Sequence, residues 1–457
     1  MIHGFFPHPA GRGTSPDTTR EHSRDMHRTL ITVSSLLFSI AVLLLGSGLL
    51  GTLLSLRASL EGYSETAIGI IVSLYFLGFI FGTYFCPRLI RRAGHIRSFT
   101  VVASLASCTV LVYGLWINPV VWMVTRFVTG TCLVGIYMII ESWLNAQTPN
   151  EVRGRIFATY MLVNLLALAC GQFLILGGDI AGMRLFAISA ILFSLGLVPV
   201  AMTRLAEPVP ITEVRLDLRK LYRAVPSGFV GSFIAGLTGS AFWGLGPLFA
   251  LQAGLSREGI AVFMSAAIIG GALLQLPIGY LSDRRDRRQV LFGISLLGAV
   301  IAGGATQVPT DTPSWLAVIM FFYGGMMFSY YSVSAALTND FTDASENVET
   351  SGNLLMVYGI GAMAGPLAAG PLMQWLGRDS LFGFFAAFGL ILAAFIQYHC
   401  LRFPRVMTPG EKTHFVPMTR TTQVAIEGIT EAASETDTSD SGAGISATGD
   451  TEEINNV

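Results

Sequence analysis

The sequence predicts an all-α membrane protein whose twelve transmembrane helices form two pseudo-symmetric six-helix bundles. Hydrophobic residues make up 52% of the 457 residues and charged residues only 12%, against about 25% charged residues in a soluble protein. Twelve segments are apolar over about 20 residues, the length that crosses the hydrocarbon core of a bilayer. A loop pattern of glycine and arginine occurs twice, 197 residues apart, which indicates two halves built on one plan.

The twelve apolar segments follow one another with short polar connections. The third and fourth are separated only by Asn118 and Pro119, and their separation rests on length and on the proline. An even number of crossings places both ends of the chain on one side of the membrane. The expected helices are 29–54, 66–87, 97–117, 119–141, 155–176, 182–204, 224–250, 258–280, 288–308, 313–338, 349–375 and 379–402.

Basic residues set the expected orientation, because cytoplasmic loops are rich in Lys and Arg. The side that holds both termini carries 23 of the 28 basic residues, and one more, Arg126, lies inside a helix. We therefore expect a multi-pass protein of the inner (cytoplasmic) membrane, embedded in the lipid bilayer, with both termini in the cytoplasm. The opposite side holds four basic residues: Arg57, Arg184, Arg257 and Arg378.

Composition divides the chain into five regions. Residues 1–28 are polar and without periodicity, and residues 403–457 are acidic and rich in Ser and Thr, so both are predicted to be disordered in the cytoplasm. Residues 29–204 and 224–402 form the two six-helix bundles. The cytoplasmic linker, 205–223, mixes basic and apolar residues and is expected to lie as a helix on anionic headgroups.

The repeated loop pattern lies where the second and eighth helices meet the cytoplasm. The first copy begins at Gly82 and the second at Gly279, and glycine there allows close approach to a neighbouring helix. The second copy has Asp283 four residues after its glycine, whereas the first copy has Cys86 at that place. The cysteine weakens the case for an ionic latch in the first half.

These residues resemble the major facilitator superfamily, whose loop between helices 2 and 3 reads Gly-x-x-x-Asp-Arg and is often echoed between helices 8 and 9. The segment from Arg126 to Gly130 is similar to the arginine motif on helix 4 of that family, and the segments 153–161 and 277–283 look closest to its YcaD-like branch. The resemblance covers about 29–402. It implies a secondary active transporter that works by alternating access, with loop charges that hold the cytoplasmic side closed in one state.

A candidate gating network follows from this resemblance. Asp283 can pair with a nearby arginine or with another loop; the alternative is a topology signal without a gating role. Glu141 ends the expected fourth helix, so we favour a cytoplasmic charge cluster over a proton carrier for it. The candidate network comprises Gly82, Arg88, Arg91, Glu141, Arg153, Gly279, Asp283, Arg284 and Arg287.

Polar and aromatic side chains inside the helices are candidates for a substrate cavity. Arg126 lies about 10 Å deep in its helix, where it could receive an anionic group, tune a nearby acid, or serve the fold alone. The set is aromatic, rich in amides and nearly uncharged, which suits a small neutral or amphipathic solute, although each member could instead join helices. The candidates are Arg126, Tyr160, Asn164, Gln172, Trp243, Gln275, Tyr330 and Tyr358.

Other functional classes find little support in the sequence. It contains no phosphate-binding Gly-x-x-x-x-Gly-Lys-Ser/Thr loop, no metal-ligand spacing and no nucleophile elbow, so we expect neither an enzyme nor a cofactor. The basic clusters are short, which argues against nucleic-acid binding. We expect a monomer with a small-molecule substrate and a proton gradient as the driving force, for which Glu141 or Asp283 could serve. A transporter-derived sensor or scaffold without solute flux is the alternative.

Overall fold

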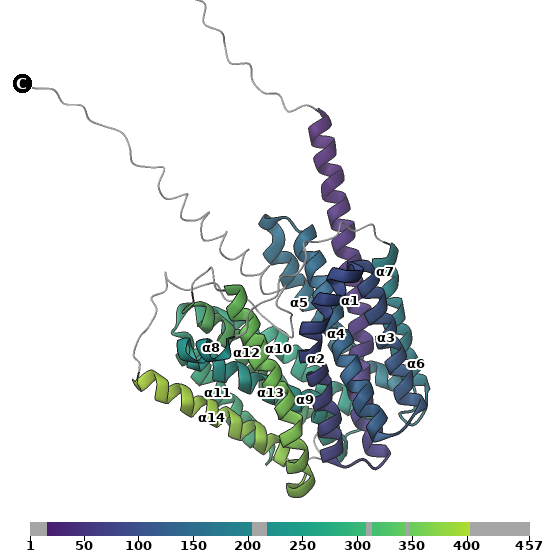
Figure 1. Ribbon diagram of the computed structural model, residues 1–457. Helices are drawn as coiled ribbons and strands as arrows, with labels where there is room; N and C mark the ends of the chain where they lie inside the picture. The colour runs from purple at the N-terminus through teal and green to yellow at the C-terminus, as the bar shows by residue number, and fades with distance from the viewer. Residues whose placement is uncertain (1–15, 203–216, 308–312, 343–346, 403–457) are drawn as a thin grey trace, which may run out of the picture.

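The computed structural model describes residues 16–202, 217–307, 313–342 and 347–402, and within these ranges the chain forms helices joined by turns (Figure 1). Twelve spans among the described residues are long and apolar enough to cross a membrane, which confirms the predicted number. The helices are α1 (Pro16–Leu60), α2 (Glu65–Ala93), α3 (His95–Leu115), α4 (Pro119–Gln147), α5 (Asn150–Phe173) with the 3-10 turn η1 (Leu174–Gly177), α6 (Arg184–Leu195), α7 (Leu197–Met202), α8 (Leu218–Ala224), α9 (Pro226–Gln252), α10 (Arg257–Arg284), α11 (Arg287–Ala305), α12 (Pro313–Asn339), α13 (Asn347–Leu376) and α14 (Ser380–Arg402).

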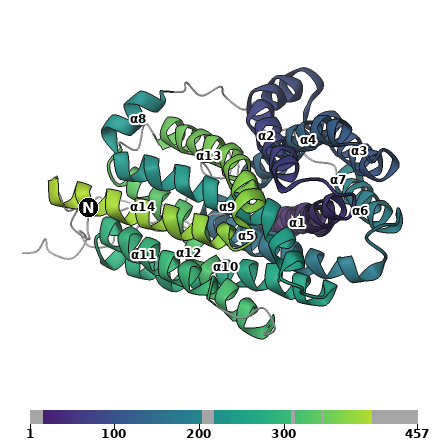
Figure 2. The same cartoon turned by 90° about the horizontal axis from the view of Figure 1, so that it is seen from below.

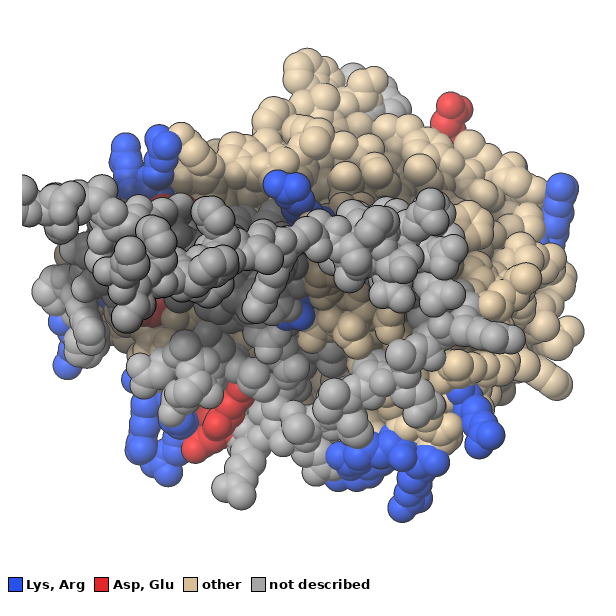
Figure 3. Space-filling model, turned by 90° about the horizontal axis from the view of Figure 1, so that it is seen from above, with Lys and Arg blue, Asp and Glu red and all other residues tan. Residues whose placement is uncertain are grey.

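The helices form two halves that stand side by side (Figure 2). We call α1–α7 the N half, in which α6 and α7 together make the sixth span, and α9–α14 the C half. The face with the α2–α3 and α10–α11 turns is called the basic face, because Lys and Arg side chains surround it (Figure 3). The opposite face, with the α1–α2 and α9–α10 turns, is called the far face.

Local chemistry explains how successive helices are separated. The Asn118 side chain accepts a hydrogen bond from the backbone N–H of Val120 at 2.9 Å, and Pro119 follows at the first helical position of α4. This cap satisfies an N–H that the first turn of a helix leaves unpaired, and it confirms the predicted separation of the third and fourth helices. Between α2 and α3 the chain turns at the single residue Gly94, whose φ of 80° favours glycine.

Glycines bring the helices of each half into close contact. An ideal Cβ on Gly78 of α2 would lie 2.0 Å from the Phe127 carbonyl oxygen of α4, and one on Gly130 of α4 would lie equally close to the Tyr75 carbonyl oxygen. The C half repeats this crossing between α10 and α12 through Gly270 and Gly324. Such close backbone approach is how helices associate inside a bilayer.

The ends of the chain differ in part from expectation. Helix α1 begins at Pro16 and projects beyond the bundle on the basic face (Figure 1), so residues 16–28 are helical where disorder was predicted. Their polar composition suggested disorder, but a helix that is already formed gains one backbone hydrogen bond for each residue that it adds. The tail 403–457, residues 1–15 and linker residues 203–216 lie outside the described part; the interfacial role of the linker stays a prediction.

Candidate substrate site and gates

The two halves are bonded to each other at the far face. Ser55 Oγ of α1 donates a hydrogen bond to the Gly244 carbonyl of α9 at 2.6 Å, and Ser265 Oγ of α10 donates to the Ala169 carbonyl of α5 at 2.9 Å. Three further hydrogen bonds join helix ends and turns of the two halves: Gln252 Nε2 to Glu65 Oε1 at 2.8 Å, Arg257 Nη1 to the Gly178 carbonyl at 2.8 Å, and the Thr66 hydroxyl to the Gln374 amide oxygen. We call these five bonds the far-face seal.

Directly inside this seal, each of the two central helices, α1 and α9, has a glycine that borders open space, and we call the volume beside these two glycines the central space. Gly51 precedes Ser55 by about one turn on the same side of α1, and an ideal Cβ on Gly51 meets no atom of the described residues within 4 Å. Gly239 precedes Gly244 on α9, and a Cβ there meets, among the described residues, only the Tyr358 hydroxyl, at 3.7 Å. Because α1 and α9 both run towards the far face, both glycines lie about 6–8 Å nearer the basic face than the Ser55–Gly244 bond.

Four aromatic residues of the C half form two ring pairs, one through Trp243, a turn from Gly239 on α9, and one through Tyr358, whose hydroxyl borders Gly239. The Trp243 ring lies 6.2 Å from the Phe328 ring, and the Tyr331 ring lies 5.2 Å from the Tyr358 ring, both in edge-to-face arrangements. Phe328 and Tyr331 are three residues apart on α12, so they share a face of that helix. We call Trp243, Phe328, Tyr331 and Tyr358 the C-half aromatic cluster. Trp243 also packs against an apolar cluster formed by Leu165 and Ala169 of α5 and Ile268 of α10, which places it where the two halves meet.

The N half contributes a buried carboxylate linked to a tyrosine. The Tyr160 hydroxyl of α5 donates a hydrogen bond to Glu141 Oε1 of α4 at 2.9 Å, and both side chains are fully buried. Tyr160 also bonds to the Asn164 side chain one turn along α5, although Asn164 Oδ1 has no hydrogen-bond partner among the described residues. Glu141, Tyr160 and Asn164 therefore form one polar group.

The burial of Glu141 corrects the predicted end of its helix. The apolar run appeared to stop at the acid, but α4 continues to Gln147 and keeps Glu141 about 9 Å inside its end. Among the expected companions, Arg88 and Arg91 are exposed at the end of α2, and Arg153 is half-buried in the first turn of α5. The acid is thus a buried group rather than the solvated end of a helix.

Three cavity candidates are used for packing within one half, as the alternative interpretation allowed. Gln172 is buried and donates to the Gly48 carbonyl of α1 at 3.2 Å, while its amide oxygen accepts from Thr52. Gln275 of α10 donates to the Phe328 carbonyl at 3.0 Å. The Tyr330 hydroxyl approaches Gly298 of α11, inside the C half. Gln172, Gln275 and Tyr330 thus contact helices of their own half, and their place in a substrate cavity stays a prediction.

Arg126 is buried inside the N half. Its guanidinium carbon lies 5.0 Å from the centre of the Tyr75 ring of α2, and it interacts with the Tyr113 hydroxyl of α3. That hydroxyl is 2.9 Å from the Thr129 hydroxyl. The arginine thus has aromatic and hydroxyl partners on α2 and α3, in agreement with the structural alternative, although its Nε has no hydrogen-bond partner among the described residues.

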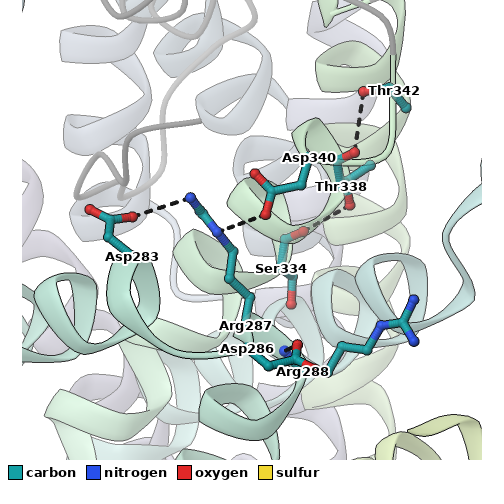
Figure 4. A network of polar contacts seen from close by, with 8 residues as sticks. All are labelled: Asp283, Asp286, Arg287, Arg288, Ser334, Thr338, Asp340 and Thr342. Carbon is teal, nitrogen blue, oxygen red and sulfur yellow. Dashed lines mark hydrogen bonds and ion pairs between the residues drawn. The ribbon is translucent and has the colours of Figure 1, made fainter. Parts of the chain in front are cut away.

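A second charged group lies at the basic end of the C half (Figure 4). Arg287, the first residue of α11, is 1% exposed and lies 2.9 Å from Asp340 Oδ2 through Nε and 3.2 Å from Asp283 Oδ1 through Nη2. Arg284 instead stacks over the Tyr280 ring at 4.0 Å. Of the two arginines that Asp283 could reach along the chain, it therefore pairs with Arg287. Asp340 belongs to the same group, and sequence reasoning left it out because it lies far away along the chain.

The structure shifts the alignment of the two loop patterns. In the equivalent crossings of the two halves, Gly270 takes the place of Gly78 and Ala267 the place of Tyr75, so equivalent residues lie 192 positions apart. The sequence alignment of the two loop patterns had used an offset of 197 residues. In this register Arg91 is the counterpart of Asp283. Cys86 lies inside α2 and packs on Gly135 of α4.

The misalignment arose because the two motif glycines lie at different depths in their helices. Helix α2 continues for eleven residues after Gly82, whereas α10 continues for only five after Gly279. Gly82 does allow close approach, since a Cβ there would lie 2.2 Å from Val134, and Gly279 is buried in α10. Position 86 is therefore not the counterpart of Asp283, and the cysteine there is no argument against an ionic latch in the N half.

Two six-helix halves that seal one face around a central space define a membrane transport protein. The family model of the Major Facilitator Superfamily matches residues 36–224 and 228–427, and the chain belongs to this family. An MFS-type transporter of Enterobacter sp. (strain 638) is 29% identical over 366 residues, covering 78% of this chain and 92% of the relative. The MFS-type transporter YcaD of Escherichia fergusonii is 28% identical over 361 residues, covering 79% and 93%. The predicted resemblance to the YcaD-like branch is confirmed.

Solved structures show the same fold. The nucleoside transporter NupG superimposes with a TM-score of 0.70 at 15% identity, covering 80% of this chain and 98% of NupG. A bacterial homologue of the human lysosomal transporter Spinster, in an inward-facing and occupied conformation, gives a TM-score of 0.66 at 16% identity, with 87% of this chain and all of the homologue covered. These similarities support the fold of two six-helix bundles.

Proposed function

We propose that this protein is a secondary active transporter that moves a small neutral or amphipathic solute across the inner membrane by alternating access. The observation that carries the proposal is the far-face seal directly beside the open space at Gly51 of α1 and at Gly239 of α9. A solute held there is separated from the far side only by contacts between the halves. Rocking of the halves would break those contacts and leave each six-helix bundle intact.

The orientation follows from the charges of the two faces. Basic side chains surround the face at which α1 enters and α14 ends (Figure 3), and cytoplasmic loops are enriched in such residues. We therefore assign the basic face, and both termini, to the cytoplasm. The far-face seal then closes the external side.

The solute class follows from the helices at the centre. Helices α9 and α12 contain no charged residue from end to end, and they supply three of the four members of the C-half aromatic cluster. A charged group at the membrane midplane is costly unless it finds a partner. This half of the site therefore suits a neutral or amphipathic solute.

Proton coupling is assigned to Glu141. A carboxyl group that is fully buried costs less free energy in its neutral form, unless it is paired, and a change in its surroundings changes its proton affinity. The hydrogen bond from Tyr160 joins the acid to α5, the helix that contacts α10 of the other half. Rocking of the halves would separate α5 from α10 and so change the access of water to the Tyr160–Glu141 pair.

Flux measurements in proteoliposomes test this proposal. The panel would contain radiolabelled neutral and amphipathic solutes, including nucleosides because the fold neighbour NupG transports them, each with and without a pH gradient. We expect one class to accumulate with the gradient, and Glu141→Gln to abolish accumulation while leaving downhill exchange. Glu258→Gln, an exposed acid at the far face, is the matched control. Absence of flux across the panel would favour a membrane sensor or scaffold.

A further inference from the structure

We propose that the C-half aromatic cluster is a subsite for a neutral, flat aromatic ring that carries a hydrogen-bond acceptor such as a carbonyl group. This inference rests on the proposed function, since it names the class of solute that the central site would hold. The ring would lie over Gly239, between α9, α12 and α13.

The shape of the space comes from the absence of a side chain at position 239. Gly239 is buried, yet an ideal Cβ on it would contact only the Tyr358 hydroxyl within 4 Å among the described residues. By contrast, a Cβ on Gly236, one turn earlier in α9, would lie 2.0 Å from the Tyr358 carbonyl oxygen. The glycine at 236 is required by packing, whereas the glycine at 239 leaves room.

The walls of this space are aromatic rings in edge-to-face pairs. Trp243 lies one turn from Gly239 on the same side of α9, and its ring meets that of Phe328. Tyr358, which borders the space directly, meets the Tyr331 ring. Trp243, Phe328 and Tyr358 keep part of their surface accessible. Aromatic rings prefer offset or edge-to-face contact with other rings, so a flat ring is the shape that these walls recognise.

A hydrogen-bond acceptor on the ring follows from a buried hydroxyl. The Tyr331 Oη atom is buried and has no hydrogen-bond partner among the described residues. A buried donor without an acceptor is unfavourable, and such groups are rare in folded proteins. A carbonyl or ring nitrogen of a bound solute would satisfy it.

The neutrality of the ring follows from the lack of charge on the surrounding helices. Helices α9 and α12 carry no charged residue, and the one charged residue of α13, Glu349, lies at its basic end, about 13 Å from Tyr358 along the helix axis. An ionised ring would therefore have no counter-charge on α9 or α12, and none on α13 within about 13 Å along the helix axis.

Two probes of matched size and polarity test the inference. Benzamide presents a flat ring and a carbonyl group, whereas cyclohexanecarboxamide presents the same amide on a puckered ring. Thermal unfolding of the purified full chain in detergent would be followed at rising probe concentration, since a ligand of the folded state raises its stability. We expect benzamide to raise the unfolding temperature and to bind about tenfold more tightly than its saturated counterpart.

Variants at position 239 locate the effect. Gly239→Leu would fill the space and weaken benzamide binding at least about tenfold. Gly293→Leu is the matched control, because Gly293 on α11 also has no atom within 4 Å of an ideal Cβ but is exposed on the outside of the bundle. Tyr331→Phe removes the hydroxyl and should weaken benzamide binding about threefold to tenfold. Should Gly239→Leu not fold, Gly239→Ala together with Tyr331→Phe provides the same comparison.

Equal stabilisation by both probes, no stabilisation by benzamide, or a benzamide effect that survives Gly239→Leu would each overturn the subsite. These outcomes are separable from a failure of the proposed function. Benzamide binding that is lost in Gly239→Leu, in a protein that shows no flux, would keep the subsite and refute transport. Solute flux that is unchanged in Gly239→Leu would keep transport and refute the subsite.

Discussion

Replacement of Gly69 by alanine should open the far face. Gly69 of α2 faces α13, and an ideal Cβ on it would lie 2.3 Å from the Pro366 carbonyl oxygen and 3.4 Å from the Gly370 Cα atom. Because ordinary van der Waals contact begins near 3.4 Å, the two helices would have to separate by about 1 Å. The obstacle is backbone, so no side-chain rotation relieves it.

The size of the effect follows from the cost of overpacking. One extra carbon atom in a tight interface costs about 1–3 kcal/mol, and here that cost falls only on the state in which α2 touches α13. A shift of this size changes the ratio of open to closed molecules by about fivefold to 150-fold. Alanine is otherwise better than glycine in a helix interior, so the fold itself should not lose stability.

Thiol labelling would measure the shift. In a background without native cysteines, Val72→Cys reports on the seal, because the side chain at 72 packs on Gly244. An impermeant maleimide applied from the far side should label this cysteine faster in Gly69→Ala by about the factor given above. Gly383→Ala is the control, since a Cβ there meets no atom within 4 Å. An unchanged rate in a folded Gly69→Ala protein would refute the assignment of this contact to the external gate.

Three further predictions concern stability and accessibility. Arg287→Met should lower the free energy of unfolding by about 3–5 kcal/mol, because it removes the guanidinium that pairs with the buried Asp340 carboxylate. The Asp283 side chain is 33% exposed, so Asp283→Asn should cost at most about 1 kcal/mol; denaturant titration in micelles distinguishes the two. Gln172→Leu should lower the unfolding temperature, since it removes the acceptor of the Thr52 hydroxyl and a donor to the Gly48 carbonyl, at a cost of about 1–3 kcal/mol. The Cys86 thiol, 1% exposed, should react with maleimide only after unfolding in SDS.

Hydrophobic length and the doubled loop pattern were sufficient to predict the fold. Twelve spans, two halves and the turn at Asn118 all follow from local properties of the chain: apolar length, charge distribution and capping. These properties act within about 30 residues, which is why a single sequence shows them. The small-residue crossings are also visible, because glycine within a transmembrane helix usually marks a close neighbour.

The site was harder to predict, because its geometry depends on where each helix ends and which neighbour it meets. Glu141 was placed at a helix end because its charge closes an apolar run, although Ser142, Trp143 and Leu144 after it are buried. Asp340, just after the end of α12, pairs with Arg287 at the start of α11, and no local sequence pattern connects the two residues. The open position at Gly239 cannot be distinguished in sequence from the packed one at Gly236. The two glycines differ only in what the neighbouring helix places opposite them.

The two halves repeat the same backbone arrangement, but their buried side chains differ in chemical type. An offset of 192 residues relates α2 to α10 and matches their crossings with α4 and α12. The functional groups near these helices nevertheless differ between the halves. The N half holds the acid that can bind a proton, with Tyr160 joining it to α5. The C half offers uncharged aromatic walls around Gly239. Under the proposed function, the proton and the solute would therefore occupy different halves. Helix α5 connects the two sites, because it bonds to Glu141 through Tyr160 and shares an apolar cluster with Trp243. Coupling between proton and solute would pass through this helix.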